Sequence, residues 1–404
     1  MSSSWGLGIA IALASILWVE IIRDSYHALA HVWKPLYRLH VWHHKVFRRD
    51  WSVASEEIYR QAHWYNDVPE ALVMLVSSIL FGLIAQRWVP WWVAGVGSVY
   101  TLIFLVSAIA RGFGVPLIEE LTDVTHRPGE FTNLPSKWIV NRPYHWRHHF
   151  DNQDAYFCGT LTFVDKILGT ALSLKNKKIA VTGASGTLGR ALLTQLHLAG
   201  ARVIALTSSD TQIELDIGGA KLPIRTITWS IGQEAELQQD LNKVDILILN
   251  HGVNVHQQRS EMAIASSFEI NTFSNLRLME VFFKTIKSDR DMIRKEVWVN
   301  TSEAEVNPAF SPLYELSKRA MGDIVTLRRL DSPCMIRKLI LGPFKSNLNP
   351  VGVMSPDWVA KQIVNLAKRD FRNIIVTINP LTIILFPIKE FIVSIYLRLF
   401  SSGK

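Results

Sequence analysis

Three groups of closely spaced histidines place the strongest constraint on how the first half of this chain can fold. Ten of the thirteen histidines lie within the first 149 residues, and eight of them form the groups His27-Ala-Leu-Ala-His31, His40-Val-Trp-His43-His44 and His145-Trp-Arg-His148-His149. Residues three and four apart share one face of a helix, so each group directs two or three imidazoles the same way. Imidazole is the commonest metal ligand in proteins, and eight rings exceed the needs of one ion. The pattern therefore predicts a site for a pair of metal ions.

Apolar segments near bilayer length separate the histidine groups. The segments are 5–22, 68–86 and 89–110, and a short turn joins the last two into a predicted hairpin. A hairpin returns the chain to the side it left, so all three histidine groups are expected on one face of a membrane. Eleven of the fourteen tryptophans precede residue 147, which suits interfacial anchoring. A buried helix in a soluble core is the alternative for the first segment, and Glu20 near its end favours it.

The distribution of basic residues predicts which side of the membrane the histidines face. The loop between the first segment and the hairpin carries seven basic residues, whereas the turn of the hairpin carries only Arg87. By the positive-inside rule the histidine groups face the cytoplasm.

Charge and cysteine usage bound the remaining classes of function. The first 174 residues hold 14 basic and 14 acidic residues, so the net charge of +8 comes from the rest of the chain. Without an arginine-rich tract or a nucleic-acid motif, this excess indicates a soluble part beside an anionic leaflet rather than a nucleic-acid partner. Cys158 and Cys334 fall in different predicted domains, which fits a reducing compartment.

The order and spacing of the histidine groups resemble the fatty acid hydroxylase/sterol desaturase superfamily of membrane di-iron enzymes. The shared pattern is HxxxH, a short gap, HxxHH, a membrane hairpin and HxxHH, and residues 152–170 resemble the stretch that follows it. The resemblance covers residues 1–172. It implies the metal ligands His27, His31, His40, His43, His44, His126, His145, His148 and His149, with His126 as a ligand or as a group behind one. We expect His63, beside Trp64 and Tyr65, to be a packed residue.

This resemblance implies O₂-dependent hydroxylation or desaturation of a lipid. The residues alone do not choose iron, because imidazole also suits zinc and copper. Such a reaction needs an external electron donor, a ferredoxin or a cytochrome, because the chain shows no fused haem or flavin module. A zinc site or a metal transporter is the alternative, although a transporter would place ionisable groups within its spans and these spans contain no histidine.

From residue 178 onward the pattern changes to alternating buried strands and helices. Ile179-Ala-Val181 is a short strand pattern, followed by Thr182-Gly183-Ala-Ser-Gly186-Thr-Leu-Gly189 and an amphipathic stretch at 190–199. Further strand patterns occupy 244–249 and 297–302. Strand, glycine turn and helix in this order place a cofactor pyrophosphate at a helix N-terminus. The alternation predicts an α/β Rossmann-type fold with a doubly wound parallel sheet.

These motifs resemble the short-chain dehydrogenase/reductase family over residues 176–370. The resemblance implies Tyr314 as general acid/base, Lys318 as the cation that lowers its pKa and holds the nicotinamide ribose, and Ser302 (or Thr301) as the group that orients a carbonyl. It further implies a catalytic role for Asn271 and a loop near the nicotinamide at 341–344. The implied cofactor-binding residues are Gly183, Ser185, Gly186, Leu188, Gly189, Asn250, Tyr314 and Lys318.

Three departures from the family pattern bear on the cofactor. The glycine spacing is TGxxGxxG, the usual Asn-Asn-Ala-Gly is Asn-His-Gly-Val, and Ser230 stands where an aspartate commonly meets adenine. Ser208 and Ser209 follow the second strand in place of an acid that would hold the ribose hydroxyl of NAD. This favours NADP over NAD.

Together these observations predict a multi-domain chain. Residues 1–172 form an α-helical membrane domain with a histidine di-metal site, residues 176–370 an NAD(P)-binding domain, and residues 371–404 an amphipathic membrane-associated segment. For 380–400, a terminal helix packed on the core is the alternative to a helix lying on the membrane.

The fusion resembles bacterial proteins that join a sterol desaturase to a short-chain dehydrogenase. It predicts a bifunctional oxidoreductase of lipid metabolism with di-iron and NADP (or NAD) as cofactors. Two alternatives stay open. One is a membrane-anchored reductase with an inactive hydroxylase half, and the other is a non-catalytic membrane scaffold that binds nucleotide.

Overall fold

The computed structural model describes residues 2–403 and divides the chain into two compact units. The first is Met1–Ala171 and the second is Leu172–Lys404. Each unit has its own candidate site.

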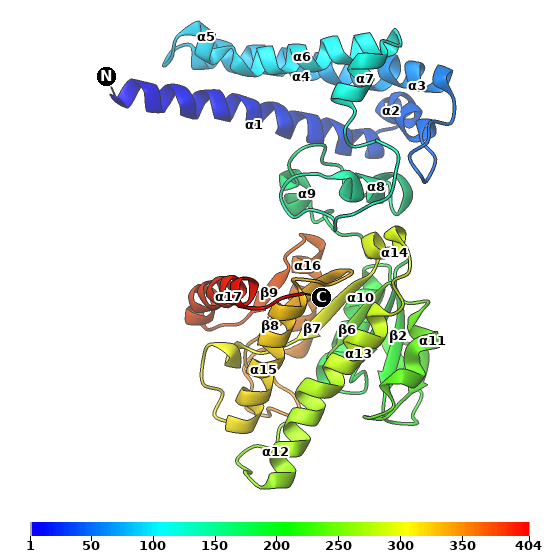
Figure 1. Ribbon diagram of the computed structural model, residues 1–404, viewed down its shortest axis with the longest axis vertical. Coiled ribbons are helices and arrows are strands. Elements are labelled where there is room, and N and C mark those ends of the chain that lie inside the picture. Colours follow the sequence, from blue (N-terminus) through cyan, green and yellow to red (C-terminus); the bar gives the residue numbers. More distant parts are fainter. Residues whose placement is uncertain (1, 404) are drawn as a thin grey trace. The chain divides into compact units, whose positions relative to one another are not determined.

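The first unit is helical. Its elements are α1 (Ser2–Val32), α2 (Lys34–Val46), α3 (Glu56–Ala62), a π-helical segment η1 (His63–Asp67), α4 (Val68–Ala85), α5 (Trp91–Ala94), α6 (Val96–Gly112), α7 (Pro116–Thr122), α8 (Arg142–Phe150) and α9 (Phe163–Leu168). The long helices α1, α4 and α6 pack along one another (Figure 1). The helical character follows from the long apolar runs of the sequence and confirms the predicted fold class of this half.

Two helical stretches among the described residues are long and apolar enough to cross a membrane, Trp5–Val32 and Glu56–Ala85. Less than a quarter of the most apolar window of each is buried within the protein. Leu13, Leu17 and Leu80 are examples of their exposed side chains. Apolar surface of this extent, left uncovered, suits contact with lipid rather than with a soluble core. The length and composition of these two stretches support membrane association. That they cross the membrane remains a proposal.

The predicted spans differ from the helices at two places. The first helix does not end at residue 22 but continues to Val32, so the first histidine group lies on the same helix as the apolar run. The third predicted span, 89–110, is wrong as a single helix. It divides into α5 and α6 at Gly95, where the backbone (φ −83°, ψ −2°) interrupts the helix for one residue.

The second unit contains a seven-stranded parallel sheet. Its strands lie in the order β5-β2-β1-β6-β7-β8-β9. The strands are β1 (Lys178–Thr182), β2 (Arg202–Thr207), β5 (Arg225–Thr228), β6 (Ile246–Leu249), β7 (Glu296–Asn300), β8 (Met335–Leu341) and β9 (Asn373–Val376). A separate antiparallel hairpin consists of β3 (Glu214–Ile217) and β4 (Ala220–Pro223). This order, with the strand sequence reversing beside β1, confirms the predicted doubly wound sheet.

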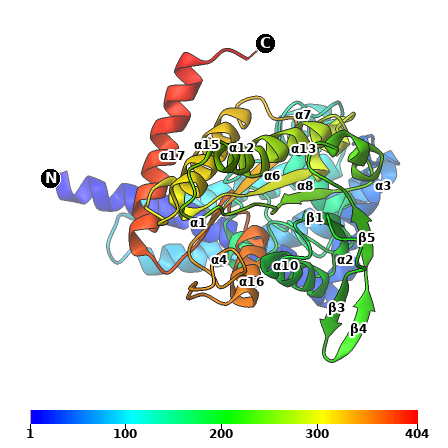
Figure 2. The ribbon, with the colours of Figure 1, turned by 90° about the horizontal axis from the view of Figure 1, so that it is seen from below.

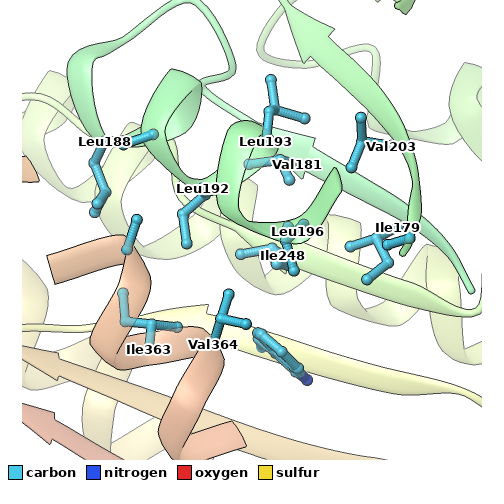
Figure 3. Packing of buried hydrophobic residues seen from close by; sticks show 14 of the residues in the cluster. Ile179, Val181, Leu188, Leu192, Leu193, Leu196, Val203, Ile248, Ile363 and Val364 are labelled. Atoms are coloured by element: carbon cyan, nitrogen blue, oxygen red, sulfur yellow. The ribbon is translucent and has the colours of Figure 1, made fainter. Parts of the chain in front are cut away.

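Helices cover both faces of this sheet. They are α10 (Thr187–Leu198), η2 (Glu234–Leu237), α11 (Gln238–Leu241), α12 (Glu261–Phe268), the π-helical segment η3 (Glu269–Phe273), α13 (Ser274–Phe283), α14 (Asp289–Arg294), η4 (Glu303–Glu305), α15 (Pro312–Arg328), α16 (Pro356–Lys368) and α17 (Pro380–Phe400). Ile179 and Val181 of β1 pack against α10 and α16, as Figure 3 shows, whereas Ala180 packs toward the face of α13 and α15. Strand side chains alternate between faces, so both sides of the sheet are apolar and buried.

The C-terminal helix α17 joins the second unit through ion pairs. The side chain of Glu390 accepts hydrogen bonds from Lys338 Nζ on β8 at 2.7 Å and from Arg329 on α15 at 2.9 Å. Lys389 pairs with Glu305 at 2.8 Å. Figure 2 shows the end of α17 extending away from the sheet, and many of its apolar side chains are exposed, Phe391 and Ile392 among them. The charges of Lys389 and Glu390, which lie within the apolar run of this helix, therefore face the protein.

The sheet also continues beyond residue 370, where we expected the dehydrogenase-like domain to end. Residues of β9 pair with 338–341 of β8 in parallel register.

Replacing Glu390 with alanine tests this anchoring. Because Lys338 is fully buried, Glu390→Ala leaves its ammonium without its nearest carboxylate, which costs about 3 kcal/mol. For a unit of this size the Tm should fall by roughly 6–12 °C. Thermal unfolding of the full chain in detergent, followed by tryptophan fluorescence, measures the change. Glu214→Ala removes an exposed partner of Lys221 and should leave the Tm unchanged. An equal Tm for both variants would contradict the anchoring.

Candidate functional site

The structure brings nine histidines of the first unit into two adjoining groups. They come from the last turns of α1, from α2, from α8 and from the loop after α7. One group is His27, His31, His40, His44 and His148, and the other is His43, His126, His145 and His149. Within each group one ring nitrogen of every residue lies within 4.8 Å of the others. These are the nine residues that the family resemblance implied.

The distances between the ring nitrogens fit shared metal ions. The Nε2 atoms of His27 and His148 are 3.0 Å apart, and those of His149 and His43 are 2.9 Å apart. His145 Nε2 lies 2.9 Å from that of His126. Two imidazoles that bind one ion at about 2.0–2.1 Å hold their nitrogens roughly 3.0–3.4 Å apart. The separations are therefore those of ligands around a common cation.

Hydrogen bonds on the outer side of three rings fix where the lone pairs point. His40 Nδ1 contacts Asn66 Oδ1 at 2.7 Å, and His148 Nδ1 contacts the carbonyl of Ala155 at 2.8 Å. Asp123 Oδ1 contacts His126 Nδ1. These oxygens can only accept, so each Nδ1 carries the hydrogen and each Nε2 presents a lone pair to its neighbours. Lone pairs directed at neighbouring imidazole nitrogens suit a cation between the rings, so the residues fit the metal pair that the family implies.

Burial keeps these rings neutral. It lowers the pKa of His40 to about 4 and lowers the pKa values of His44, His145, His148 and His149 well below the ordinary value, with further lowering from neighbouring histidines. Neutral imidazole is the form that binds metals.

Several residues that the sequence analysis did not identify position the histidine groups. Asn66 belongs to η1, and π-helical turns often occur at functional sites. The buried carboxylate of Asp165 accepts hydrogen bonds from Tyr144 of α8 and from the backbone N–H groups of Phe157 and Cys158, so it fixes α8 against the segment that follows. For Asp123, the available signal was its position three residues before His126. His63 lies outside both groups and pairs with Asp67 at 2.6 Å.

The second unit contains a cavity of about 890 Å³ at the carboxyl ends of its strands. Gly183, Ser185, Gly186, Leu188 and Gly189 line one side of it. These are the predicted glycine-turn residues, at the N-terminus of α10.

The glycine turn leaves no room for a side chain at Gly183 or Gly189. A Cβ on Gly189 would lie 2.2 Å from the carbonyl oxygen of Gly183, and Gly183 itself has φ +61°. The N-terminus of α10 therefore stays open to the cavity, which suits a pyrophosphate.

The other side of the cavity holds the predicted catalytic residues. Tyr314, Lys318 and Ser302 line it, and Asn250, which was predicted to bind the cofactor, also lines the cavity. Lys318 Nζ donates to the carbonyl of Asn300 at 2.9 Å and lies 5.9 Å from the centre of the Tyr314 ring.

Asn271 stands behind this side rather than in it, whereas Thr301 lines the cavity. The side chain of Asn271, on the π-helical η3, hydrogen-bonds both backbone groups of Val253. It therefore positions the loop after β6. Thr301 Oγ1 donates to the carbonyl of Leu339.

The pKa of Tyr314 is raised, whereas the sequence analysis expected it to be lowered. Burial raises the pKa of Tyr314, and a hydrogen bond from Ser302 only partly opposes this. Burial also lowers the pKa of Lys318 to about 8, against the attraction of Glu305. Burial of Tyr314 thus opposes the lowering of its pKa that was expected from Lys318.

The departures from the family pattern lie at the other end of the cavity, beside β2 and β5. Trp229, Ser208 and His251 line this end. The rings of Trp229 and His251 meet edge to face with centres 5.3 Å apart. Ser208 presents a hydroxyl where an acid would hold the ribose of NAD.

Sequence comparisons agree with this architecture. The short chain dehydrogenase family matches residues 177–332. Over 408 aligned residues, covering 99% of this chain and 99% of the relative, the sequence is 64% identical to the monoglucosyldiacylglycerol epimerase of Synechocystis sp.. The chain belongs to the same family as this epimerase.

More distant similarities concern the second unit. The sequence is 27% identical to the L-xylulose reductase of Bos taurus over 195 residues, which cover 46% of this chain and 75% of that protein. A short chain dehydrogenase of Burkholderia cenocepacia, solved in complex with NADP, is 19% identical with a TM-score of 0.43, covering 57% of this chain and all of that one.

Membership of the epimerase family and the short-chain dehydrogenase domain make this chain an enzyme with an oxidoreductase unit. A fold of this kind uses NAD(P) to interconvert alcohols and carbonyls.

Removing the carboxylate behind His126 tests the metal centre. Asp123→Ala frees the His126 ring to rotate, and loss of such a partner typically weakens metal binding 10–100-fold. We expect less bound metal per chain, measured by elemental mass spectrometry after purification with a chelator. Glu57→Ala, at an exposed position of α3, is the matched control. Unchanged metal content in Asp123→Ala would refute the role of this carboxylate.

Replacing Gly189 with alanine tests the cofactor turn. The added Cβ would lie 2.2 Å from the Gly183 carbonyl oxygen, so the turn must open and the backbone can no longer surround a pyrophosphate. NADPH affinity should fall by at least about tenfold, as measured by quenching of tryptophan fluorescence. Gly6→Ala meets nothing within 4 Å and should bind normally. Equal affinities, with both variants folded by circular dichroism, would exclude this turn as the binding site.

Proposed function

We propose that this chain inverts one carbinol carbon in the glucosyl headgroup of a monoglucosyldiacylglycerol. The observation that carries the proposal is the 64% identity over the full length of an epimerase with that substrate in its name, together with a cavity lined by Tyr314, Lys318 and Ser302. The substrate is then a membrane glycolipid, which suits a chain with long apolar helices.

Inversion at an unactivated carbinol carbon favours redox chemistry. The C–H bond there is not acidic, so the hydrogen leaves most readily as a hydride while the hydroxyl loses its proton. The resulting ketone is planar, and return of hydride to its opposite face gives the epimer. A bound NAD(P) would supply this chemistry by accepting the hydride and giving it back, so the overall reaction consumes neither oxidant nor reductant.

The residues of the cavity supply the remaining roles. Tyr314 accepts the hydroxyl proton in the first half of the reaction and returns it in the second. Ser302 holds the reacting oxygen, and Lys318 holds the ribose of the cofactor. Asn271 positions the loop after β6, and Asn250 lines the cofactor side. We propose NADP rather than NAD, because Ser208 lines the cavity beside the end of β2, where an acid would favour NAD.

The histidine groups favour a second activity. Nine imidazoles in two adjoining groups would hold a pair of iron ions, as the resemblance to the hydroxylase/desaturase superfamily implies. Bound iron would supply O₂-dependent oxidation of a lipid C–H bond, with electrons from a ferredoxin or a cytochrome. This half could then oxidise the same carbinol before the second unit reduces the ketone, or it could act on another position of the lipid.

We further propose the placement of the parts. Residues 1–172 form the membrane domain and 176–370 the dehydrogenase-like domain, extended by β9, while 371–404 includes the helix α17 beside the membrane. Basic residues in the loop after the first apolar segment support a cytoplasmic position for the histidines and for the second unit.

An isotope experiment distinguishes the two routes to the ketone. With a glucolipid deuterated at its ring carbinol carbons, hydride return predicts that the product keeps its deuterium and that no O₂ is consumed. Tyr314→Phe should lower the rate by roughly 10²–10⁴-fold while NADPH still binds. Mass spectrometry of the product lipid and an oxygen electrode supply the measurements.

The same assay on His148→Ala serves as the comparison. Unchanged epimerisation in this variant would assign the reaction to the second unit alone. Loss of deuterium to water with stoichiometric O₂ uptake would instead assign the oxidation to the metal centre. No epimerisation by the wild-type protein would overturn the proposal.

A further inference from the structure

The cavity of the second unit extends well beyond the groups that suit a dinucleotide. Past Tyr314, two loops close its far end, one at 308–311 before α15 and one at 346–351 after β8. A third segment, beginning at Asn254 after β6, completes it. The chemistry of these three segments indicates what the cavity accepts beside the cofactor.

The polar residues of this end carry no formal charge. Asn254, Asn347 and Asn349 line it, and an amide side chain can both donate and accept a hydrogen bond. Asn254 is held in place, because its Oδ1 accepts from Ser311 Oγ and from the backbone N–H of His256, both at 2.7 Å, and its Nδ2 donates to the carbonyl of Leu348 at 3.3 Å. Among the described residues that line the cavity on these three segments, none is Asp, Glu, Lys or Arg. Amides without a formal charge suit the hydroxyl groups of a sugar.

The mouth of this end is apolar. Phe310, Val351 and Leu348 line it and are 92%, 86% and 40% exposed. Phe310 has φ +55°, a left-handed conformation that costs a bulky residue energy. The surrounding loop enforces this conformation, since the backbone N–H of Ala309 donates to Glu315 Oε1 at 2.8 Å. A strained aromatic residue held in solvent at the edge of a cavity indicates contact with a ligand.

We propose that this end of the cavity is a subsite for an uncharged glycosyl headgroup carried on a lipid. The amides bind the sugar hydroxyls, and Phe310, Leu348 and Val351 contact the glycerol and the first methylenes of the acyl chains. The inference rests on the proposed function and extends it, because it names how the lipid is selected. The subsite favours a glycolipid over a nucleotide sugar, since a diphosphate would meet no Lys or Arg side chain among the described lining residues of these segments.

Substitution of Phe310 separates ligand contact from stability. Asparagine tolerates the left-handed conformation better than phenylalanine does, so Phe310→Asn should not lower the Tm. The variant is assayed as the full chain in detergent micelles, with monoglucosyldiacylglycerol as substrate. We expect its KM to rise about tenfold or more and by a larger factor than kcat falls, because apolar contact with the lipid is lost. Val351→Asn should act in the same direction. Phe371→Asn removes an exposed aromatic ring away from the cavity and should match the wild type.

UDP-glucose provides the second arm. The wild-type protein should epimerise the glycolipid and leave UDP-glucose unchanged. Turnover of UDP-glucose at a comparable kcat/KM, or a KM for Phe310→Asn within twofold of the wild type, would overturn the subsite while leaving the epimerase activity in place. A wild-type protein that epimerises neither compound would overturn the proposed function itself.

Discussion

The first unit is organised around imidazole nitrogens that face one another at about 3 Å. Neutral rings in this arrangement direct lone pairs into the same small volume, which repel unless a cation lies between them. The outer hydrogen bonds to Asn66, Asp123 and the Ala155 carbonyl make this orientation permanent, because each fixes the hydrogen on the far nitrogen. The residues around the cluster therefore fit a metal pair, and α1, α2 and α8 supply eight of its nine histidines.

The second unit is organised around its cavity rather than around a cluster of histidines. Its cavity must admit a pyrophosphate close to the backbone, so Gly183 and Gly189 leave no room for side chains. Burial raises the pKa of Tyr314, the residue that we propose as its acid/base group. The charges of α17 that could have faced lipid instead pair with Lys338 and Arg329. The apolar side chains of this helix remain available for a membrane.

The similarity to an epimerase bears on how the reactions of the two units could be connected. Epimerisation through a ketone consumes nothing overall, so a dehydrogenase unit suffices for it in principle. The metal centre then has either an oxidative role in the same reaction or one of its own. The fate of the carbinol hydrogen separates these possibilities, because hydride return keeps it in the product and O₂-dependent oxidation releases it.

The sequence by itself determined the two kinds of fold and most of the candidate residues. Two local patterns can be recognised without knowledge of contacts. One is the helical spacing within each histidine group, and the other is the strand–glycine–helix order with Tyr314 and Lys318 downstream. It did not determine the length of α1, the break at Gly95 or the seventh strand β9, which depend on packing. Only the tertiary structure placed Asn66 and Asp165 behind the histidine groups. Asn66 lies 26 residues from its partner His40, and Asp165 lies 21 residues from Tyr144, which belongs to a different helix. It alone raised the pKa of Tyr314 and put Phe310 at the mouth of the cavity, because burial and loop geometry arise from groups that are distant in the chain.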